Sequence, residues 1–168
     1  MENGNALIEV KIGALIMDPN TNTPIVVLKG IESETVLPIW VGAFEANAIA
    51  LEIEKIAPPR PMTHDLLRNL IVELGLKVDR VVVTSLRENT FYAVIEMTGE
   101  DGEPMRLDSR PSDAIALALR TDCPIFVDLE VIQASRNTIA TDEESESEGE
   151  GGEEEWPDVI GDASDLPM

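Results

Sequence analysis

The sequence predicts an α+β domain in which an antiparallel or mixed β-sheet, with hairpins and a meander, packs against about three helices. Three observations predict this class. Runs rich in β-branched residues follow one another in groups, helix-like runs stand apart from them, and strands and helices do not alternate regularly. This order is typical of α+β folds and differs from that of repeated βαβ units.

The first part of the chain predicts a hairpin and a third strand. Strands are expected over residues 7–17 and 24–28, because the dense turn signal of residues 18–22 separates two apolar runs. A third strand is expected over residues 35–41, where β-branched residues recur. Gly42 ends it.

Two helices are expected next. From Ala43 the apolar spacing is that of an amphipathic helix, which the prolines within residues 58–61 end. The apolar positions of this helix are Phe44, Ala48, Leu51 and Ile56. A second helix is expected to begin with Thr63 as N-cap, to carry Asp65 where the helix dipole favours a negative charge, and to end at Gly75. Its buried side is expected to hold Leu66, Leu67, Leu70, Ile71 and Leu74.

The rest of the body predicts a meander, a third helix and one more strand. Strands over residues 78–86 and 90–98 and a short strand over residues 105–107 are separated by turn residues, which is the pattern of an antiparallel meander. The segment RPSD opens a helix over residues 114–120, and a last strand is expected over residues 125–127.

The charge divides the chain into a body and a tail. Of the 168 residues, 33 are acidic and 12 basic, which gives a net charge of -21, and residues 141–168 hold 12 of the acids and no base. Such a segment cannot bury enough apolar surface to offset the entropy lost on ordering. We therefore expect one domain over residues 1–140 and an acidic disordered tail over residues 141–168.

The composition also excludes several classes of protein. Cys123 is the single cysteine, so no intramolecular disulfide can form, and with one histidine no cluster suits a structural zinc site. No run approaches the length of a membrane span, and residues 1–7 lack the pattern of a signal peptide, so we expect a soluble cytoplasmic protein that makes no membrane contact. The acidity argues against easy binding of nucleic acid, which requires clustered Lys and Arg.

Four separated motifs resemble a known family. They are LPIWVGAFEA at residues 37–46, RPMTHDL at residues 60–66, TFYA at residues 90–93 and DSRPSDAIAL at residues 108–117. In this order and spacing, across roughly residues 7–135, the chain resembles the bifunctional nuclease domain family. Asn89 stands where that family usually has Gly, a departure that concerns turn geometry. The resemblance implies an α+β domain, homo-oligomeric packing, and a nuclease activity on RNA and DNA that is attributed to some members.

The residues that such chemistry needs are present. Phosphodiester cleavage requires a positioned nucleophile, proton transfer and neutralisation of charge at phosphorus. His64 is the single imidazole, which excludes a pair of histidines within one subunit, whereas carboxylates that hold Mg²⁺ or Mn²⁺ offer another route; no organic cofactor is expected. The candidate catalytic residues are His64, Asp65, Asp108 and Asp113, the candidate metal ligands are Glu45, Asp65 and Asp113, and the candidate substrate-binding residues are Arg60 and Arg110.

Each candidate also has a structural alternative. His64 directly follows the predicted N-cap and is compatible with a purely structural role. Asp65 and Asp113 suit partners of a helix dipole. Asp108 can pair with Arg106 or Arg110, and the two candidate arginines Arg60 and Arg110 can form structural ion pairs with these acids.

Two classes of function therefore stay open. The first is a nuclease acting on RNA or DNA, whose site forms where residues 60–65 and 108–113 meet. The second is a non-catalytic, self-associating module that binds a small ligand or a protein through the same polar cleft. A focused positive cleft beside the carboxylates favours the nuclease, whereas arginines engaged in internal ion pairs favour the module. A homo-oligomer, most simply a symmetric dimer, is expected in either case.

Overall fold

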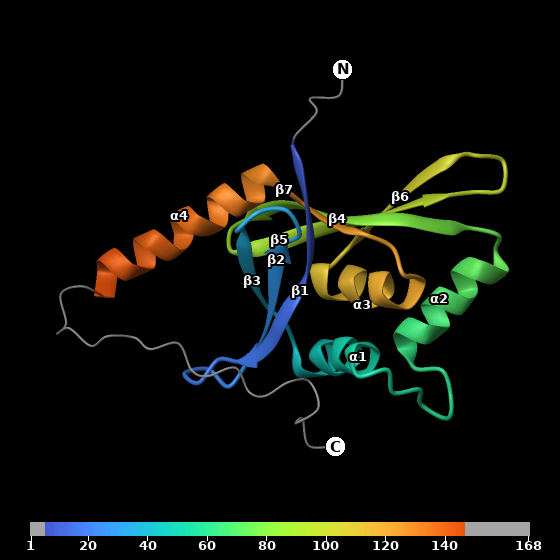
Figure 1. Ribbon diagram of the computed structural model, residues 1–168, viewed down its shortest axis with the longest axis horizontal. Coiled ribbons are helices and arrows are strands. Elements are labelled where there is room, and N and C mark those ends of the chain that lie inside the picture. The colour runs from blue at the N-terminus through green and yellow to red at the C-terminus, as the bar shows by residue number, and fades with distance from the viewer. Residues whose placement is uncertain (1–5, 147–168) are drawn as a thin grey trace.

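The computed structural model describes residues 6–146 and confirms the α+β class (Figure 1). Within that range the chain forms one mixed sheet and four helices. The elements are β1 (Leu7–Met17), β2 (Pro24–Gly30), β3 (Val36–Trp40), α1 (Ala43–Ile53), α2 (Thr63–Glu73), β4 (Lys77–Arg87), β5 (Thr90–Thr98), β6 (Pro104–Ser109), α3 (Pro111–Thr121), β7 (Ile125–Asp128) and α4 (Leu129–Glu146). None of the described helices is long and apolar enough to span a membrane.

The sheet joins two antiparallel units through a short central strand. Its strand order is β3-β2-β1-β7-β4-β5-β6. The predicted hairpin and meander supply the two outer units, and β7 pairs antiparallel with β1 and parallel with β4. The parallel pair is the one that makes the sheet mixed.

Helix α3 lies at the centre of the molecule. It contacts α1, α2, β4 and β5, and residues 114–118 are all buried. A helix that is apolar on nearly every side must be covered by other elements on nearly every side. Small alanines at Ala114, Ala116 and Ala118 let those neighbours approach closely. Figure 1 shows α1 and α2 beside α3, so the first turns of the three helices can come together.

The predicted buried side of α2 is wrong in part. Ile71 is buried and Leu67 is half-buried, whereas Leu66, Leu70 and Leu74 are exposed. The main contacts of the helix are with α3 and β4, so the side of α2 away from them stays uncovered. Gly75 adopts a left-handed backbone with φ of 72° and ends the helix as predicted.

Two details at helix N-termini also differ from the prediction. The N-cap of α2 is Met62, and Thr63 is the first helical residue. Asp65 supplies the cap instead, because its Oδ2 accepts a hydrogen bond from the Met62 backbone N–H at 2.9 Å. In α1 the predicted apolar position Phe44 is 90% exposed, since the core contacts of that helix come from Ala46, Ala48 and Ile49 further along.

The C-terminal helix was not predicted. Helix α4 packs on β3, β4 and β7, with Val131 and Ile132 buried, and extends across the predicted domain boundary to Glu146. Its last residues are acidic and carry no apolar pattern, which is why the sequence gives no helix signal there. The predicted disordered tail otherwise falls on residues 147–168, which lie outside the described residues.

The turn between β4 and β5 explains the departure from the family pattern. Asn89 has a φ of 60°, in the left-handed region that glycine adopts without strain. Asparagine is among the side chains that tolerate this region best. Asparagine at position 89 is therefore compatible with this tight turn.

Candidate functional site

A cleft of about 660 Å³ lies where the N-terminal ends of α1, α2 and α3 meet β5 and β6. Its polar lining includes Glu45, His64 and Asp113 from the first turns of the three helices and Arg110 at the N-cap of α3. Its apolar lining comes from Phe44, Leu51, Met62, Leu67, Ile95 and Leu107. The two predicted segments, residues 60–65 and 108–113, do meet here.

His64 and Asp113 form the centre of the polar group. His64 Nε2 lies 2.8 Å from Asp113 Oδ1, and the imidazole side chain is 13% exposed. When the neutral ring carries its proton on Nε2, it donates to Asp113 and leaves Nδ1 able to accept a proton. The carboxylate thereby fixes both the orientation and the tautomer of the ring.

Arg110 joins Asp113 to Glu45. Its Nε donates to Asp113 Oδ2 at 2.8 Å, one terminal nitrogen donates to Asp113 Oδ1 at 3.2 Å, and the other lies 2.9 Å from Glu45 Oε1. A Cβ at Gly42 would collide with the Glu45 carboxylate, so a larger residue at this position would have to displace that side chain. The Arg110 side chain lines the cleft and is 64% exposed, so a ligand can reach it.

These contacts shift the pKa values of Asp113 and Arg110. Burial raises the pKa of the Asp113 carboxyl, but hydrogen bonds from Arg110 and His64 outweigh burial and hold that pKa below its ordinary value. Hydrogen bonds to Asp113 and then to Glu45 raise the pKa of Arg110. The carboxylate and the guanidinium are therefore charged over the whole physiological range.

Asp65 belongs to a different ion pair. Its Oδ1 accepts a hydrogen bond from Arg120 Nε at 2.7 Å, and the Arg120 side chain is 3% exposed. Burial raises the pKa of Asp65, but hydrogen bonds from the Met62 backbone and from Arg120 hold it below the ordinary value. Asp65 lines a second hollow of about 320 Å³, with Arg120, and does not line the cleft.

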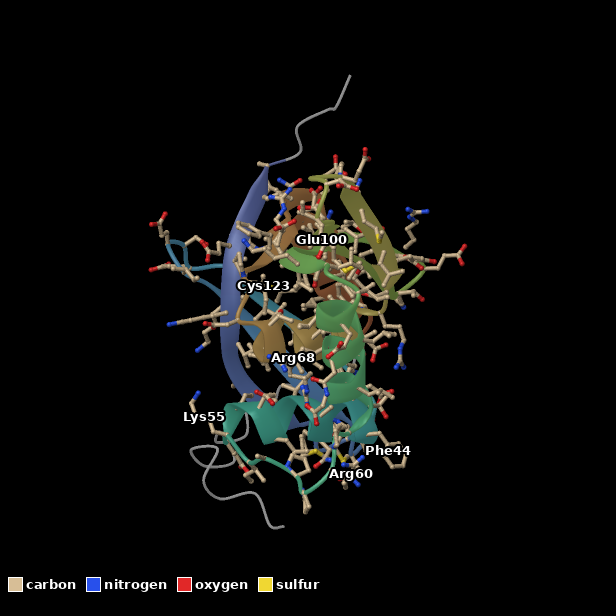
Figure 2. The ribbon with its side chains drawn as sticks, turned by 90° about the vertical axis from the view of Figure 1, so that its right-hand side faces the viewer. Phe44, Lys55, Arg60, Arg68, Glu100 and Cys123 are labelled. Atoms are coloured by element: carbon tan, nitrogen blue, oxygen red, sulfur yellow. The ribbon has the colours of Figure 1, made fainter. Side chains whose placement is uncertain are left out.

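Two further predicted residues, Asp108 and Arg60, lie outside these ion pairs. Asp108 lines the cleft from β6 and forms no ion pair with Arg106, Arg110 or any other described residue. Arg60 is exposed in the segment between α1 and α2, where Figure 2 labels it at the lower end of the molecule. It is not among the residues that line the cleft, and no ion pair joins it to a described residue.

The predicted metal ligands do not form one group of ligands. Glu45 and Asp113 lie on either side of the Arg110 guanidinium, and Asp65 is held by Arg120. Within residues 6–146 no group of three or more His, Cys, Asp or Glu side chains is close enough to hold one ion. As arranged, these residues do not by themselves fit a resident Mg²⁺ or Mn²⁺, and the proton transfer below is derived without one.

Two residues of this region were missed by sequence reasoning. Arg120 ties three helices together, because it donates to Asp65 on α2, to the Ala48 carbonyl on α1 and to the Ala116 carbonyl on its own helix α3. The sequence offered one sign of this role, since Arg120 is a single arginine at the end of an otherwise apolar predicted helix. Phe44 was assigned to the apolar positions of the first helix, and its place two residues after Gly42, where the predicted strand ends, was the available sign of exposure.

Most of the sequence of the domain matches a described family. The family model of the bifunctional nuclease domain matches residues 26–140, which include every residue of the cleft. The chain belongs to the bifunctional nuclease domain family.

This bifunctional nuclease domain has relatives in bacteria and plants. It is 38% identical over 138 residues to Uncharacterized protein Rv1829 of Mycobacterium tuberculosis, an alignment that covers 82% of this chain and 81% of that protein. It is 32% identical over 97 residues to Bifunctional nuclease 2 of Oryza sativa subsp. japonica, covering 56% of this chain and 30% of the plant protein. The alignment with Bifunctional nuclease 1 of Arabidopsis thaliana has 30% identity over 108 residues and covers 62% and 33%. The similarity thus reaches about a third of each plant protein.

Proposed function

We propose that this bifunctional nuclease domain hydrolyses phosphodiester bonds of RNA or DNA in the cleft between α1, α2 and α3. The observation that carries the proposal is the hydrogen-bonded series from His64 through Asp113 and Arg110 to Glu45, on the wall of a cleft that solvent can enter. The names of the plant relatives support the same class of reaction.

His64 is the proton-transfer group in this proposal. With Nε2 held by Asp113, Nδ1 takes a proton from the attacking water or hydroxyl as the new bond to phosphorus forms. The imidazolium that results is stabilised by the Asp113 carboxylate at 2.8 Å. The leaving oxygen departs from the opposite side of the phosphorus, so it takes its proton from water, and the imidazolium then gives its own proton back to solvent.

Arg110 is the phosphate-binding group. A guanidinium offers several N–H donors in one plane and matches two oxygens of a phosphate. The first turns of three helices converge on the cleft, and the positive ends of their dipoles favour an anion there. Glu45 and Asp113 oppose this attraction, so substrate must draw Arg110 partly away from its carboxylates.

Dependence on a divalent cation stays a prediction. Two carboxylates and one guanidinium leave the cluster net negative while His64 is neutral, which disfavours a phosphate diester. Mg²⁺ commonly uses one or two carboxylates together with substrate oxygens and keeps several waters. We therefore expect faster cleavage in Mg²⁺ or Mn²⁺ than in EDTA.

The experiment measures cleavage of labelled single-stranded RNA and of plasmid DNA by the full chain. The protein is purified over two unrelated columns to exclude a contaminating nuclease, and each assay is run with Mg²⁺, Mn²⁺ and EDTA. We expect His64→Ala to lower the rate by about a hundredfold or more, because that is the usual contribution of a positioned acid or base. Asp113→Asn is expected to lower it less, because the ring is retained.

The matched control is Asp101→Asn, which removes one carboxylate from the exposed turn between β5 and β6. Its rate is expected to equal that of the unsubstituted chain. Equal cleavage by the His64, Asp113 and Asp101 variants would mean that the activity lies elsewhere or in a contaminant. Circular dichroism of each variant checks that it is folded.

A second candidate function is favoured by one observation. Arg110 and Arg120 are both engaged in internal ion pairs, which is the arrangement expected of a non-catalytic binding module. In that case the cleft binds a small anion or a protein side chain and breaks no bond. Absence of cleavage under every metal condition, with oligonucleotide binding that His64→Ala leaves unchanged, would favour this alternative.

A further inference from the structure

Strand β6 ends the sheet on one side, and its outer edge is open. Residues 104–108 are exposed, and no described element pairs with that edge. An unpaired edge offers backbone N–H and C=O groups to another strand. Strand β3 ends the sheet on the other side, where α4 packs beside it.

The two edges differ in the backbone groups that they offer. On β3 the Val41 N–H donates to the Pro24 carbonyl, so the alternation of an antiparallel pair points the backbone of Pro38 outward. Proline has no N–H, which blocks pairing at the middle of that edge. On β6 the Gly99 N–H donates to the Glu103 carbonyl, so the same alternation points the backbones of Pro104, Arg106 and Asp108 outward. The proline is the first residue of this strand, so the backbone N–H groups of Arg106 and Asp108 stay available for pairing.

The charges on β6 complement themselves. When two copies of β6 pair antiparallel around Leu107, each Arg106 lies opposite Asp108 of the other strand, and both pairs can exchange two backbone hydrogen bonds. If the two strands instead paired around Arg106, the two arginines would lie opposite each other, and if they paired around Asp108, the two aspartates would. Like charges in directly opposed positions repel each other. The sequence of β6 therefore favours one register.

The neighbouring side chains fit the same register. On one face of the sheet Arg80 pairs with Glu96, and Glu96 Oε1 lies 3.6 Å from Arg106 Nε. Asp108 of the second copy would lie beside Arg106, so basic and acidic side chains would alternate across the interface. On the other face Met105 and Leu107 are 46% and 44% exposed. Directly opposed leucines at the centre of the pair cover apolar surface that a single chain leaves in water.

We propose that β6 pairs antiparallel with β6 of a second copy of this chain, with Leu107 opposite Leu107 on the two-fold axis. The interface is isologous, because the same strand serves both partners. Leu107, Asp108 and Ser109 also line the cleft, so the two clefts lie next to the axis and the second copy completes the outer wall of each. This assignment does not depend on what the cleft binds.

The first test reverses charge across the pair. Light scattering of the full chain is expected to give a dimer at micromolar concentration. Asp108→Lys and Arg106→Glu each place like charges opposite one another, and each is expected to raise the dimer dissociation constant about tenfold or more. The double variant restores opposite charges and is expected to restore the dimer. Asp101→Lys, the same charge change in the turn before β6, is expected to leave the dimer intact.

The second test fixes the register by cross-linking, in a Cys123→Ser background. Leu107→Cys places two thiols in a directly opposed pair whose Cα atoms are about 4.5 Å apart, within the range of a disulfide. Mild oxidation is expected to yield a covalent dimer. Met105→Cys on the same face is the control, because four residues of offset separate its two Cα atoms by ~14 Å.

Three results would overturn the proposal. They are a monomer at micromolar concentration, a dimer that neither charge reversal weakens, and a dimer in which Leu107→Cys does not cross-link. The last two would place the contact between copies on another surface. Thermal unfolding of each variant separates loss of pairing from loss of folding, since Arg106→Glu also removes an internal partner of Glu96.

Discussion

Asp113 couples the site to the stability of the fold. Its pKa lies below the ordinary 3.8, because hydrogen bonds from Arg110 and His64 outweigh burial. A carboxyl with a depressed folded-state pKa stabilises the protein above its unfolded pKa, and this contribution is lost as the pH falls through that value toward the lower folded one. We therefore expect the free energy of unfolding to fall below about pH 4, and to fall less steeply in Asp113→Asn. Urea denaturation across this range, with Asp101→Asn as control, measures it.

Phe44 is the side chain best placed to recognise a base. It is 90% exposed and lines the cleft beside Arg110, and Figure 2 shows it projecting from the lower end of the molecule. An aromatic ring that stacks on a base contributes about 1–3 kcal/mol. If the proposed function holds, Phe44→Ala weakens binding of a single-stranded oligonucleotide about tenfold, as fluorescence anisotropy would measure. Leu74→Ala, an exposed side chain outside the cleft, should change nothing.

For single residues, the sequence predicts which side chains gather at the site but not which of them bond to each other. His64, Arg110 and Asp113 were predicted as site residues, and they do lie together. Asp65 was predicted beside them and instead bonds Arg120, because successive helical residues point in different directions from the axis. The partner of a charged side chain depends on which helices cross, and sequence spacing alone does not contain that information.

Among the elements, the three helices of the site share one guanidinium. Asp65→Ala would remove the carboxylate that is hydrogen-bonded to the buried Arg120, leaving Glu52 at 3.9 Å as the nearest remaining carboxylate, and would remove the acceptor of the Met62 N–H. We expect this substitution to lower the free energy of unfolding by about 2 kcal/mol, because losing a hydrogen bond to a charged buried group costs that much. Chemical denaturation of Asp65→Ala beside Asp101→Ala measures the difference. Equal stability of the two variants would show that α1, α2 and α3 hold together without this contact.

The elements were predictable where local signals are strong. The strands that form β1, β4 and β5 were predicted within one residue at each end, since alternating apolar runs with clear turns are local features. Helix α4 was missed, because its helical state depends on packing against β3, β4 and β7. The exposed leucines of α2 were misplaced for the same reason, since the sequence does not tell which side of a helix stays uncovered.

For the whole molecule, the fold class could be predicted from the sequence, whereas the order of the strands in the sheet could not. Hairpin, helices and meander together indicate α+β, as the structure confirms. The insertion of β7 between β1 and β4 joins residues far apart in the chain, and a strand of four residues carries too little pattern to choose its neighbours. The site depends on this insertion, because β7 holds together the two halves of the sheet on which the helices rest.

Pro38, whose backbone faces outward on β3, limits how many copies of the chain can join by strand pairing. A sheet with two open edges can add copies without limit, as a fibre does. Here one edge lacks a donor at Pro38, so addition through β6 uses the remaining edge and stops at a pair of chains. Pro38→Val would supply the missing N–H, and the two-chain particle would then be expected to lengthen into an insoluble polymer.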